Sequence, residues 1–102
     1  GQDQVDAARL NAADEVGPDR SVRASASVLT VVAQRVRVYE LQPSERPDAA
    51  GAANGVDAVI LDERSVRGWT AVDRQIFREG MRSLGFVLVS SNEGIDVYLR
   101  RP

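Results

Sequence analysis

The 102-residue chain contains no cysteine and no histidine. The absence of cysteine excludes a disulfide framework and a thiolate metal site. The absence of histidine excludes the Ser-His-Asp triad, the usual general base and the commonest zinc ligand. An Asp-rich calcium loop is lacking too, so we expect neither a metal nor another cofactor to be bound.

Lysine is also missing, and all thirteen basic residues are arginine. This bias is typical of GC-rich codon usage; the alternative is selection for guanidinium recognition of phosphate or carboxylate. Fifteen acidic residues bring the net charge to −2. A nucleic-acid-binding domain is expected to be basic, so nucleic acid is not predicted as a partner.

Long apolar runs are absent, and none approaches the roughly 20 residues that cross a bilayer. The length suits one domain with one core. A hydrophobic content of 43% and a charged content of 27% are ordinary for a globular protein. Because the chain begins with a glycine and not a methionine, we expect residues 1–102 to be a single α/β domain that is either processed or cut from a longer protein.

The apolar segment 57–62 predicts the central strand of a sheet. Continuous apolar strands are typical of parallel sheets that helices cover on both faces. We expect strands 21–25 and 35–41 to run parallel to it, or nearly so, and strand 86–91 to join them. Segment 94–100 alternates apolar and polar residues, which predicts an antiparallel outer strand with one solvated face.

Helices are predicted at 3–16, 26–34 and 70–84. Segment 26–34 also has strand character, but a crossover is needed between parallel strands. Helix 70–84 is expected to start with a capping box of Thr70 and Asp73. The fold class that follows is a small three-layer α/β/α domain, Rossmann-like, with a mostly parallel sheet that ends in an antiparallel hairpin.

Helix 70–84 should cover the central strand. Its glycine, Gly80, is expected to allow close packing on the sheet. Ile60 of the strand is therefore predicted to contact the helix stripe. The stripe consists of Val72, Ile76, Phe77, Met81 and Leu84.

Two connections are predicted from turn residues. Segment 42–55 is rich in Pro, Gly and Ala without periodicity, so we expect a long surface loop, with disorder favoured over a function. The final hairpin is expected to turn through a three-residue loop, Asn92-Glu93-Gly94, with a left-handed glycine.

Chemistry is sought first where the central strand ends. Asp62 and its neighbour Arg64 lie at a strand carboxyl end, where ligands of open α/β sheets bind. The carboxylate of Asp62 could hold Mg²⁺ or a ribose. The structural alternative is that it pairs with Arg64 or Arg67, or caps a turn.

Two more residues are candidates for ligand binding. Ser25 stands at a strand-to-helix turn, where it could bind an anion or simply cap the helix. Trp69, the single tryptophan, is either part of the core or a platform for a sugar or a partner. The candidate binding residues are thus Ser25, Asp62, Arg64 and Trp69, and no catalytic or metal-binding residue is predicted.

Four segments in order resemble the soluble C-terminal domain of a family of polytopic bacterial membrane proteins. They are Ser21-Val-Arg-Ala-Ser25, Arg35-Val-Arg-Val-Tyr39, Asp57-Ala-Val-Ile-Leu-Asp62 and Gly94-Ile-Asp-Val-Tyr-Leu-Arg100, within residues 15–101. That family has no known function and looks related to GT-C-type glycosyltransferases, which use lipid-linked sugars. No catalytic residue carries over, because such families keep their catalytic acids in the membrane part.

The resemblance implies a non-catalytic accessory or binding domain on the extracytoplasmic side of the cell membrane. Its partners would be the rest of its own membrane protein and a glycan or lipid-linked sugar. The full-length protein could be a glycosyltransferase, while the fragment itself is expected to lack enzymatic activity. The alternative is a small nucleotide- or sugar-phosphate-binding enzyme domain that uses Asp62.

Overall fold

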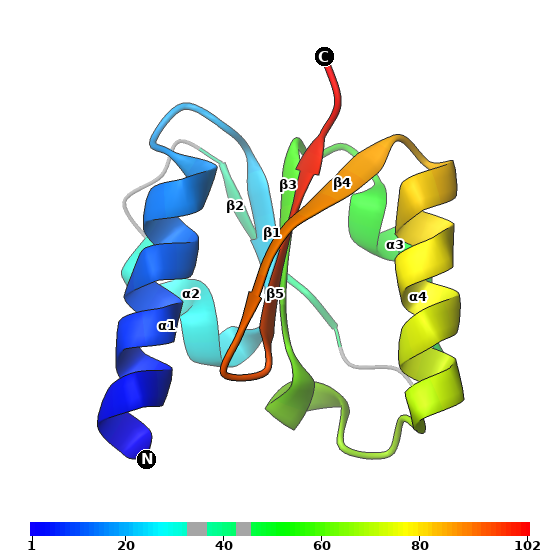
Figure 1. Ribbon diagram of the computed structural model, residues 1–102. Coiled ribbons are helices and arrows are strands. Elements are labelled where there is room, and N and C mark those ends of the chain that lie inside the picture. Colours follow the sequence, from blue (N-terminus) through cyan, green and yellow to red (C-terminus); the bar gives the residue numbers. More distant parts are fainter. Residues whose placement is uncertain (33–36, 43–45) are drawn as a thin grey trace.

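The computed structural model describes residues 1–32, 37–42 and 46–102. Five strands form one sheet within this part of the chain. They are β1 (Val22–Ala24), β2 (Val38–Glu40), β3 (Ala58–Asp62), β4 (Phe86–Asn92) and β5 (Ile95–Arg100). Their order in space is β2-β1-β3-β5-β4, so the predicted central position of segment 57–62 is confirmed (Figure 1).

The sheet is mixed. β1 pairs in parallel with β2 and with β3, whereas β5 pairs in antiparallel fashion with β3 and with β4. Among these described pairings the expected parallel majority is therefore not present. The predicted antiparallel hairpin at the end of the chain is confirmed.

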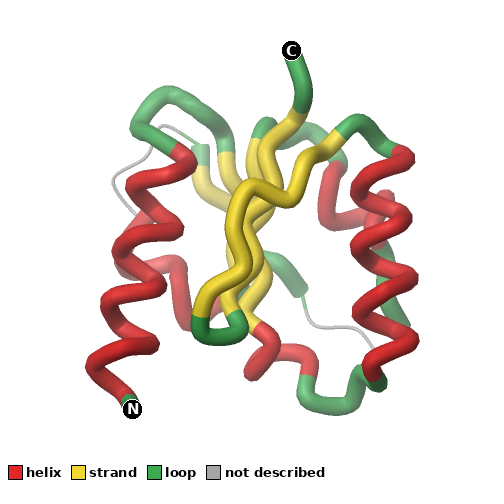
Figure 2. Tube along the Cα trace, in the orientation of Figure 1, coloured by secondary structure: helices red, strands yellow, loops and turns green. Residues whose placement is uncertain are grey.

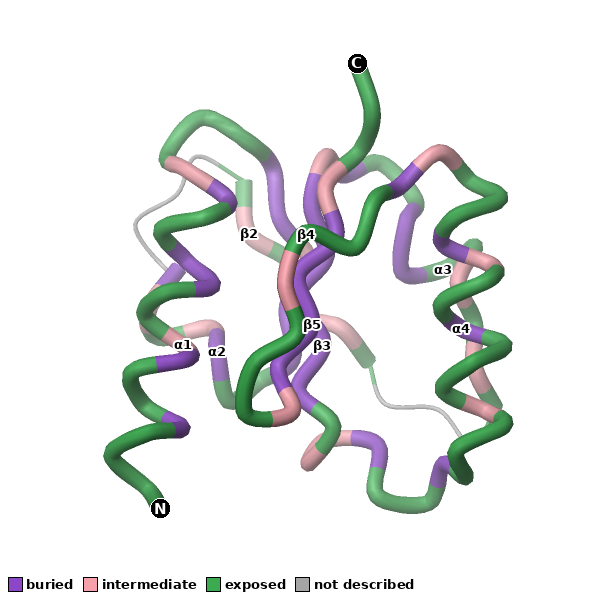
Figure 3. Tube along the Cα trace, viewed as in Figure 1, coloured by how far each residue is buried: buried purple, intermediate pink, exposed green. Residues whose placement is uncertain are grey.

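The prediction that segment 94–100 is an outer strand was wrong. β5 lies between β3 and β4, and its first four residues are buried. Asp96, one of its polar residues, is tolerated inside because Arg78 pairs with it at 3.0 Å and Ser91 donates a hydrogen bond to it at 2.5 Å. β4 is the outer strand instead, and most of it is exposed (Figure 3).

Helices cover both faces of the sheet. They are α1 (Gln2–Val16), α2 (Ala26–Val32), α3 (Ala49–Ala53) and α4 (Ala71–Ser83), with a 3-10 turn, η1 (Glu63–Val66), after β3. α1 and α2 lie on one face, and α3 and α4 on the other (Figures 1 and 2). The three predicted helices are confirmed, although residues 33 and 34 of the second lie outside the described residues, as do 35 and 36 of the predicted strand.

The side chains of β3 contribute to two separate cores. Successive side chains on a strand point to opposite faces. Ala58 and Ile60 pack with α1 and α2, whereas Val59 and Leu61 pack with Phe77 of α4 and with α3. The predicted contact of Ile60 with the stripe of α4 was therefore wrong, because Ile60 lies on the opposite face of the sheet.

The apolar stripe of α4 is narrower than predicted. Phe77 and Met81 are buried, but Val72, Ile76 and Leu84 are 66%, 53% and 42% exposed. The helix is turned so that these three side chains face away from the core. The capping box at its start is confirmed, since the side chains of Thr70 and Asp73 each accept a hydrogen bond from the other's backbone N–H group.

The predicted loop at 42–55 contains helix α3, so that prediction was wrong for this part; residues 43–45 lie outside the described residues. Asp48 caps α3 by accepting a hydrogen bond from the Gly51 N–H group at 2.9 Å. Ala52 and Ala53 are buried. A five-residue helix of small side chains gives no periodic signal, which explains why composition alone indicated a loop.

The hairpin turn differs from the prediction by one residue. β4 extends to Asn92, so only Glu93 and Gly94 remain in the loop. Both have positive φ angles, 53° and 77°. Two consecutive positive φ angles are typical of a type I′ turn, which fits the twist of an antiparallel pair.

The close packing expected at Gly80 involves α3 rather than the sheet. A methyl group added at Gly80 would lie 2.6 Å from the Cβ atom of Ala49. A Gly→Ala change inside a helix normally stabilises it by about 1 kcal/mol. We predict that Gly80→Ala instead lowers the free energy of unfolding by about 1 to 3 kcal/mol, because overpacking costs more than the helix gains.

Urea unfolding measures this effect, with the Ala49→Gly variant and the double variant as controls. In the double variant the overlap is gone, so the two changes should show a favourable coupling rather than additive losses. A stabilising Gly80→Ala change would contradict the packing of α3 on α4.

Candidate functional site

The candidate site lies where the connections after β1 and β3 diverge. The chain leaves β1 into α2 on one face of the sheet, and it leaves β3 through η1 towards α4 on the other face (Figure 1). In open α/β sheets such a divergence opens a crevice at the carboxyl ends of the strands, where ligands bind. Ser25 follows β1 and Asp62 ends β3, so the structure brings these two predicted residues together.

Ser25 links the two strand ends. Its side chain is buried, and its Oγ accepts a hydrogen bond from the Asp62 N–H group at 3.0 Å. It also lies 3.0 Å from the Oγ of Ser65, which donates to the Asp62 carbonyl at 2.7 Å. The Ser25 hydroxyl therefore holds the end of β3, and the expectation that it caps the following helix was wrong.

The carboxylate of Asp62 is fully buried and engaged on both oxygens. Oδ1 accepts hydrogen bonds from the backbone N–H group and the Nη1 of Arg64, both at 3.0 Å. Oδ2 accepts from the Ser27 hydroxyl at 2.7 Å and from Arg9 Nη2 at 3.4 Å. These bonds connect the carboxyl edge of the sheet to α1, α2 and η1.

The charge of this carboxylate is retained despite burial. Burial alone would raise the pKa of Asp62, but the hydrogen bonds from Ser27 and from Arg64, together with the Arg64 charge, lower the pKa below its usual value. Asp62 therefore has the structural role that was the alternative to ligand binding. It pairs with Arg64, not Arg67, and it caps the 3-10 turn η1. In this arrangement neither oxygen faces a ligand.

Arg9 was missed by sequence reasoning. It comes from α1, and its Nη1 also pairs with Asp6 at 3.0 Å. Its side chain is only 18% exposed, and its buried Nε has no hydrogen-bond partner among the described residues. The one available signal for its partial burial was its position next to Ala8, one of the buried apolar residues of α1. Nothing in the sequence could pair it with a carboxylate 53 positions away.

Trp69 does not join this network. Asp62 faces α1, while Leu61, the residue before it, faces the other side of the sheet and lies near Trp69. The indole is 9% exposed and its ring lies 5.4 Å from that of Phe77. Trp69 is therefore part of the core on the α3 and α4 side of the sheet, which was one of the two roles considered for it from the sequence.

Trp69 also lines a cavity of about 300 Å³ beside the carboxyl ends of β1, β2 and β3. Three charged side chains border it: Arg23, Glu40 and Asp48. Arg23 Nη1 donates hydrogen bonds to three carbonyl oxygens at the end of α3, at 2.7 to 3.1 Å. Asp48 caps the start of that helix. Glu40 is exposed and has no hydrogen bond or ion pair among the described residues.

No group of three or more acidic, His or Cys side chains is arranged to hold a metal ion in the part of the chain that the structure describes. Within the same residues, no helix combines the length and hydropathy that crossing a bilayer requires. Comparisons with protein-family models, with curated proteins and with solved structures give no significant match to this chain.

The Asp62 network yields a prediction about stability. Asp62→Asn should lower the free energy of unfolding at neutral pH by about 3 to 5 kcal/mol, because it leaves the guanidinium groups of Arg9 and Arg64 without their buried counter-charge. Asp57→Asn, half-buried just before the same strand, is the matched control. Its carboxylate has only long contacts, with Ser21 at 3.4 Å and Arg100 at 3.9 Å, so the change should cost at most about 1 kcal/mol.

The same experiment has a pH dependence with a fixed sign. Because the pKa of Asp62 is lowered in the folded protein, its stabilising effect is present above the unfolded-state pKa of about 3.9 and is lost as the pH falls further. The gap between wild type and Asp62→Asn should therefore narrow below about pH 4. Urea unfolding across this range measures it, and a gap that widens in acid would refute the assignment.

Proposed function

We propose that this chain is a non-catalytic binding domain of a larger membrane protein, located on the extracytoplasmic side, and that it binds a sugar unit of a glycan or lipid-linked sugar in the cavity beside Trp69. The membrane setting rests on the resemblance of its four segments to the soluble domain of polytopic membrane proteins. We also propose that the fold is a three-layer, Rossmann-like variant, in which the carboxyl ends of β1, β2 and β3 border the cavity that holds the ligand.

The cavity beside Trp69 is the observation that supports sugar binding. It combines an aromatic wall with a few charged groups, which is the usual composition of a small-molecule site. The flat face of the Trp69 indole is apolar, which suits stacking against the apolar face of a sugar ring. Glu40 adds a carboxylate that makes no internal bond among the described residues and can accept hydrogen bonds from sugar hydroxyls.

The environment of the acidic residues supports binding without catalysis. Glycoside hydrolysis requires two carboxyl groups that act on one bond. Glu40 and Asp48 both border the cavity, but Asp48 is engaged in capping α3. Asp62 is buried and bonded on both oxygens. Among the described residues that line the cavity, only Glu40 has a carboxylate left to act on a bound sugar.

The alternative is a nucleotide- or sugar-phosphate-binding enzyme domain that uses Asp62. The observation in its favour is that two arginines, Arg9 and Arg64, flank this carboxylate at the divergence of the connections. A phosphate would have to displace Asp62 from both guanidinium groups. That exchange would break a buried charge pair, so this function has weaker support.

The proposal predicts binding that Trp69 itself reports, since it is the single tryptophan. Soluble mannose, N-acetylglucosamine and their disaccharides, titrated into the purified chain, should change its fluorescence in a saturable way for at least one sugar. Glu40→Gln should weaken that binding about tenfold, because a hydrogen bond to a charged acceptor becomes one to a neutral amide.

Glu93→Gln, on the exposed hairpin turn, is the matched control and should bind as the wild type does. No fluorescence response to any sugar, or equal effects of the two variants, would contradict sugar binding in this cavity. Turnover of nucleotide sugars or phosphate esters that Asp62→Asn abolishes would favour the alternative function.

A further inference from the structure

A second groove lies between α4 and the outer strand β4. It has a volume of about 400 Å³. Arg78 and Arg82 of α4 border it on one side, and Val87 and Leu88 of β4 on the other. It is separate from the cavity beside Trp69, because the two share no lining residue.

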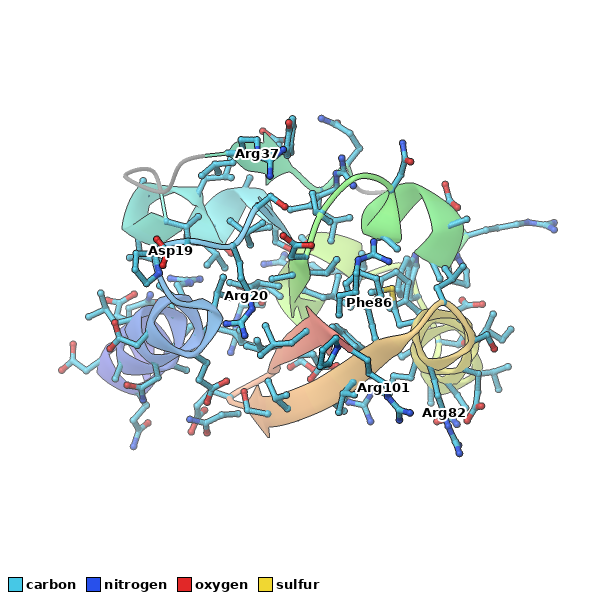
Figure 4. All side chains as sticks on the ribbon, turned by 90° about the horizontal axis from the view of Figure 1, so that it is seen from above. Asp19, Arg20, Arg37, Arg82, Phe86 and Arg101 are labelled. Atoms are coloured by element: carbon cyan, nitrogen blue, oxygen red, sulfur yellow. The ribbon has the colours of Figure 1, made fainter. Side chains whose placement is uncertain are left out.

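Two guanidinium groups at this groove are available to a ligand. Arg82 and Arg101 are exposed, and neither side chain has a hydrogen bond or ion pair with the described residues. Figure 4 shows both projecting from the part of the molecule where α4 and β4 lie. Arg78, the third arginine, is paired with Asp96. Glu79 also borders the groove, where Gln75 donates to its carboxylate at 2.9 Å.

Tyr98 supplies an independent indication of a ligand. It lines the groove from β5 and is 1% exposed, yet its hydroxyl has no hydrogen-bond partner among the described residues. Buried hydroxyl groups are normally hydrogen-bonded. Burial and the nearby negative charge of Asp96 raise the pKa of Tyr98, and the neighbouring Arg78 guanidinium only partly offsets this, so the hydroxyl stays protonated.

The apolar side of the groove is also exposed to a ligand. Leu88 is 37% exposed, and it pairs with Tyr98 of β5, so its side chain lies on the same face of the sheet as α4. Apolar side chains in this position can cover a hydrocarbon group. The groove thus combines unpaired positive charge, an unsatisfied buried donor and an apolar wall.

We propose that this groove binds a phosphate group carried on an apolar body. The guanidinium groups of Arg82 and Arg101 bind the phosphate oxygens, for which their planar geometry is suited. The Tyr98 hydroxyl donates to a ligand oxygen, and the apolar body packs on Leu88. This site is independent of the sugar site proposed above and does not rest on it.

Two sources share this chemistry: a soluble phosphate monoester and the head group of an anionic lipid. Octyl phosphate represents the first, and phosphatidylcholine vesicles that contain phosphatidic acid represent the second. 1-Octanol and pure phosphatidylcholine vesicles are the controls without the charged phosphate monoester. Binding of octyl phosphate to the purified chain is followed by calorimetry, and vesicle binding by co-sedimentation.

We expect saturable binding of octyl phosphate, of the phosphatidic acid vesicles, or of both, and none of the controls. The double variant Arg82→Gln/Arg101→Gln should weaken binding at least about tenfold through the loss of two charge-assisted contacts. Arg67 is exposed and lies before the N-terminal end of α4, away from the groove. The Arg67→Gln variant is therefore the matched control and should leave binding unchanged.

Tyr98→Phe separates a ligand role from a structural one. We expect about fivefold weaker binding, while the thermal midpoint stays equal to that of the wild type or rises, because an unsatisfied buried hydroxyl is removed. The proposal is overturned if neither phosphate probe binds, if 1-octanol binds as tightly as octyl phosphate, or if the arginine variant binds like Arg67→Gln. A lower midpoint with unchanged binding in Tyr98→Phe would overturn the role of the hydroxyl.

Discussion

The buried carboxylate of Asp62 is the interaction on which this structure depends most. Burying a charge is costly unless other groups compensate for its lost hydration. Here a serine hydroxyl, a backbone N–H group and two guanidinium groups do so, and they come from α1, α2 and η1. If the carboxylate were neutral or absent, these three elements would lose the charged contact that they share at the sheet edge. The position that a ligand takes in many α/β folds is filled by the protein's own side chains.

This arrangement shifts the candidate functions to other parts of the molecule. With the crevice between β1 and β3 occupied, both proposed sites use cavities on the α3 and α4 side of the sheet. The cavity beside Trp69 and the groove beside Tyr98 both lie there, at opposite ends of one aromatic series. In it, the rings of Trp69 and Phe77 lie 5.4 Å apart and those of Phe77 and Tyr98 5.8 Å apart. Three aromatic rings that contact one another therefore border both proposed sites.

The sequence predicted the elements better than their packing. Period and capping located the strands and the helices α1 and α4, because those signals are local. They could not show that Ile60 and Phe77 lie on opposite faces of the sheet, since a continuous apolar run has no solvated side to indicate its orientation. The edge position was misassigned for a related reason: Asp96 and Tyr98 look solvated until Arg78, from another element, is placed beside them.

The site was predictable in its location but not in its partners. Asp62, Ser25 and Arg64 could be placed at the strand end from chain order and the position of apolar runs. Arg9 could not, because its contact with Asp62 depends on how α1 packs across the sheet. The sequence placed Tyr98 only within the predicted strand 94–100 and Arg101 directly after it. Their significance comes from an unsatisfied hydroxyl and unpaired charge, which appear only in three dimensions.

The most direct test of this account is the titration of the Asp62 carboxyl carbon by NMR in the folded protein. A charged carboxylate held by Ser27 and two arginines should titrate below the usual value of about 3.9. It should also titrate below the carboxyl group of Asp62 in the acid-unfolded chain. A pKa at or above about 3.9 would contradict the account, because burial would then dominate and the carboxyl group would be poorly held and open to a ligand.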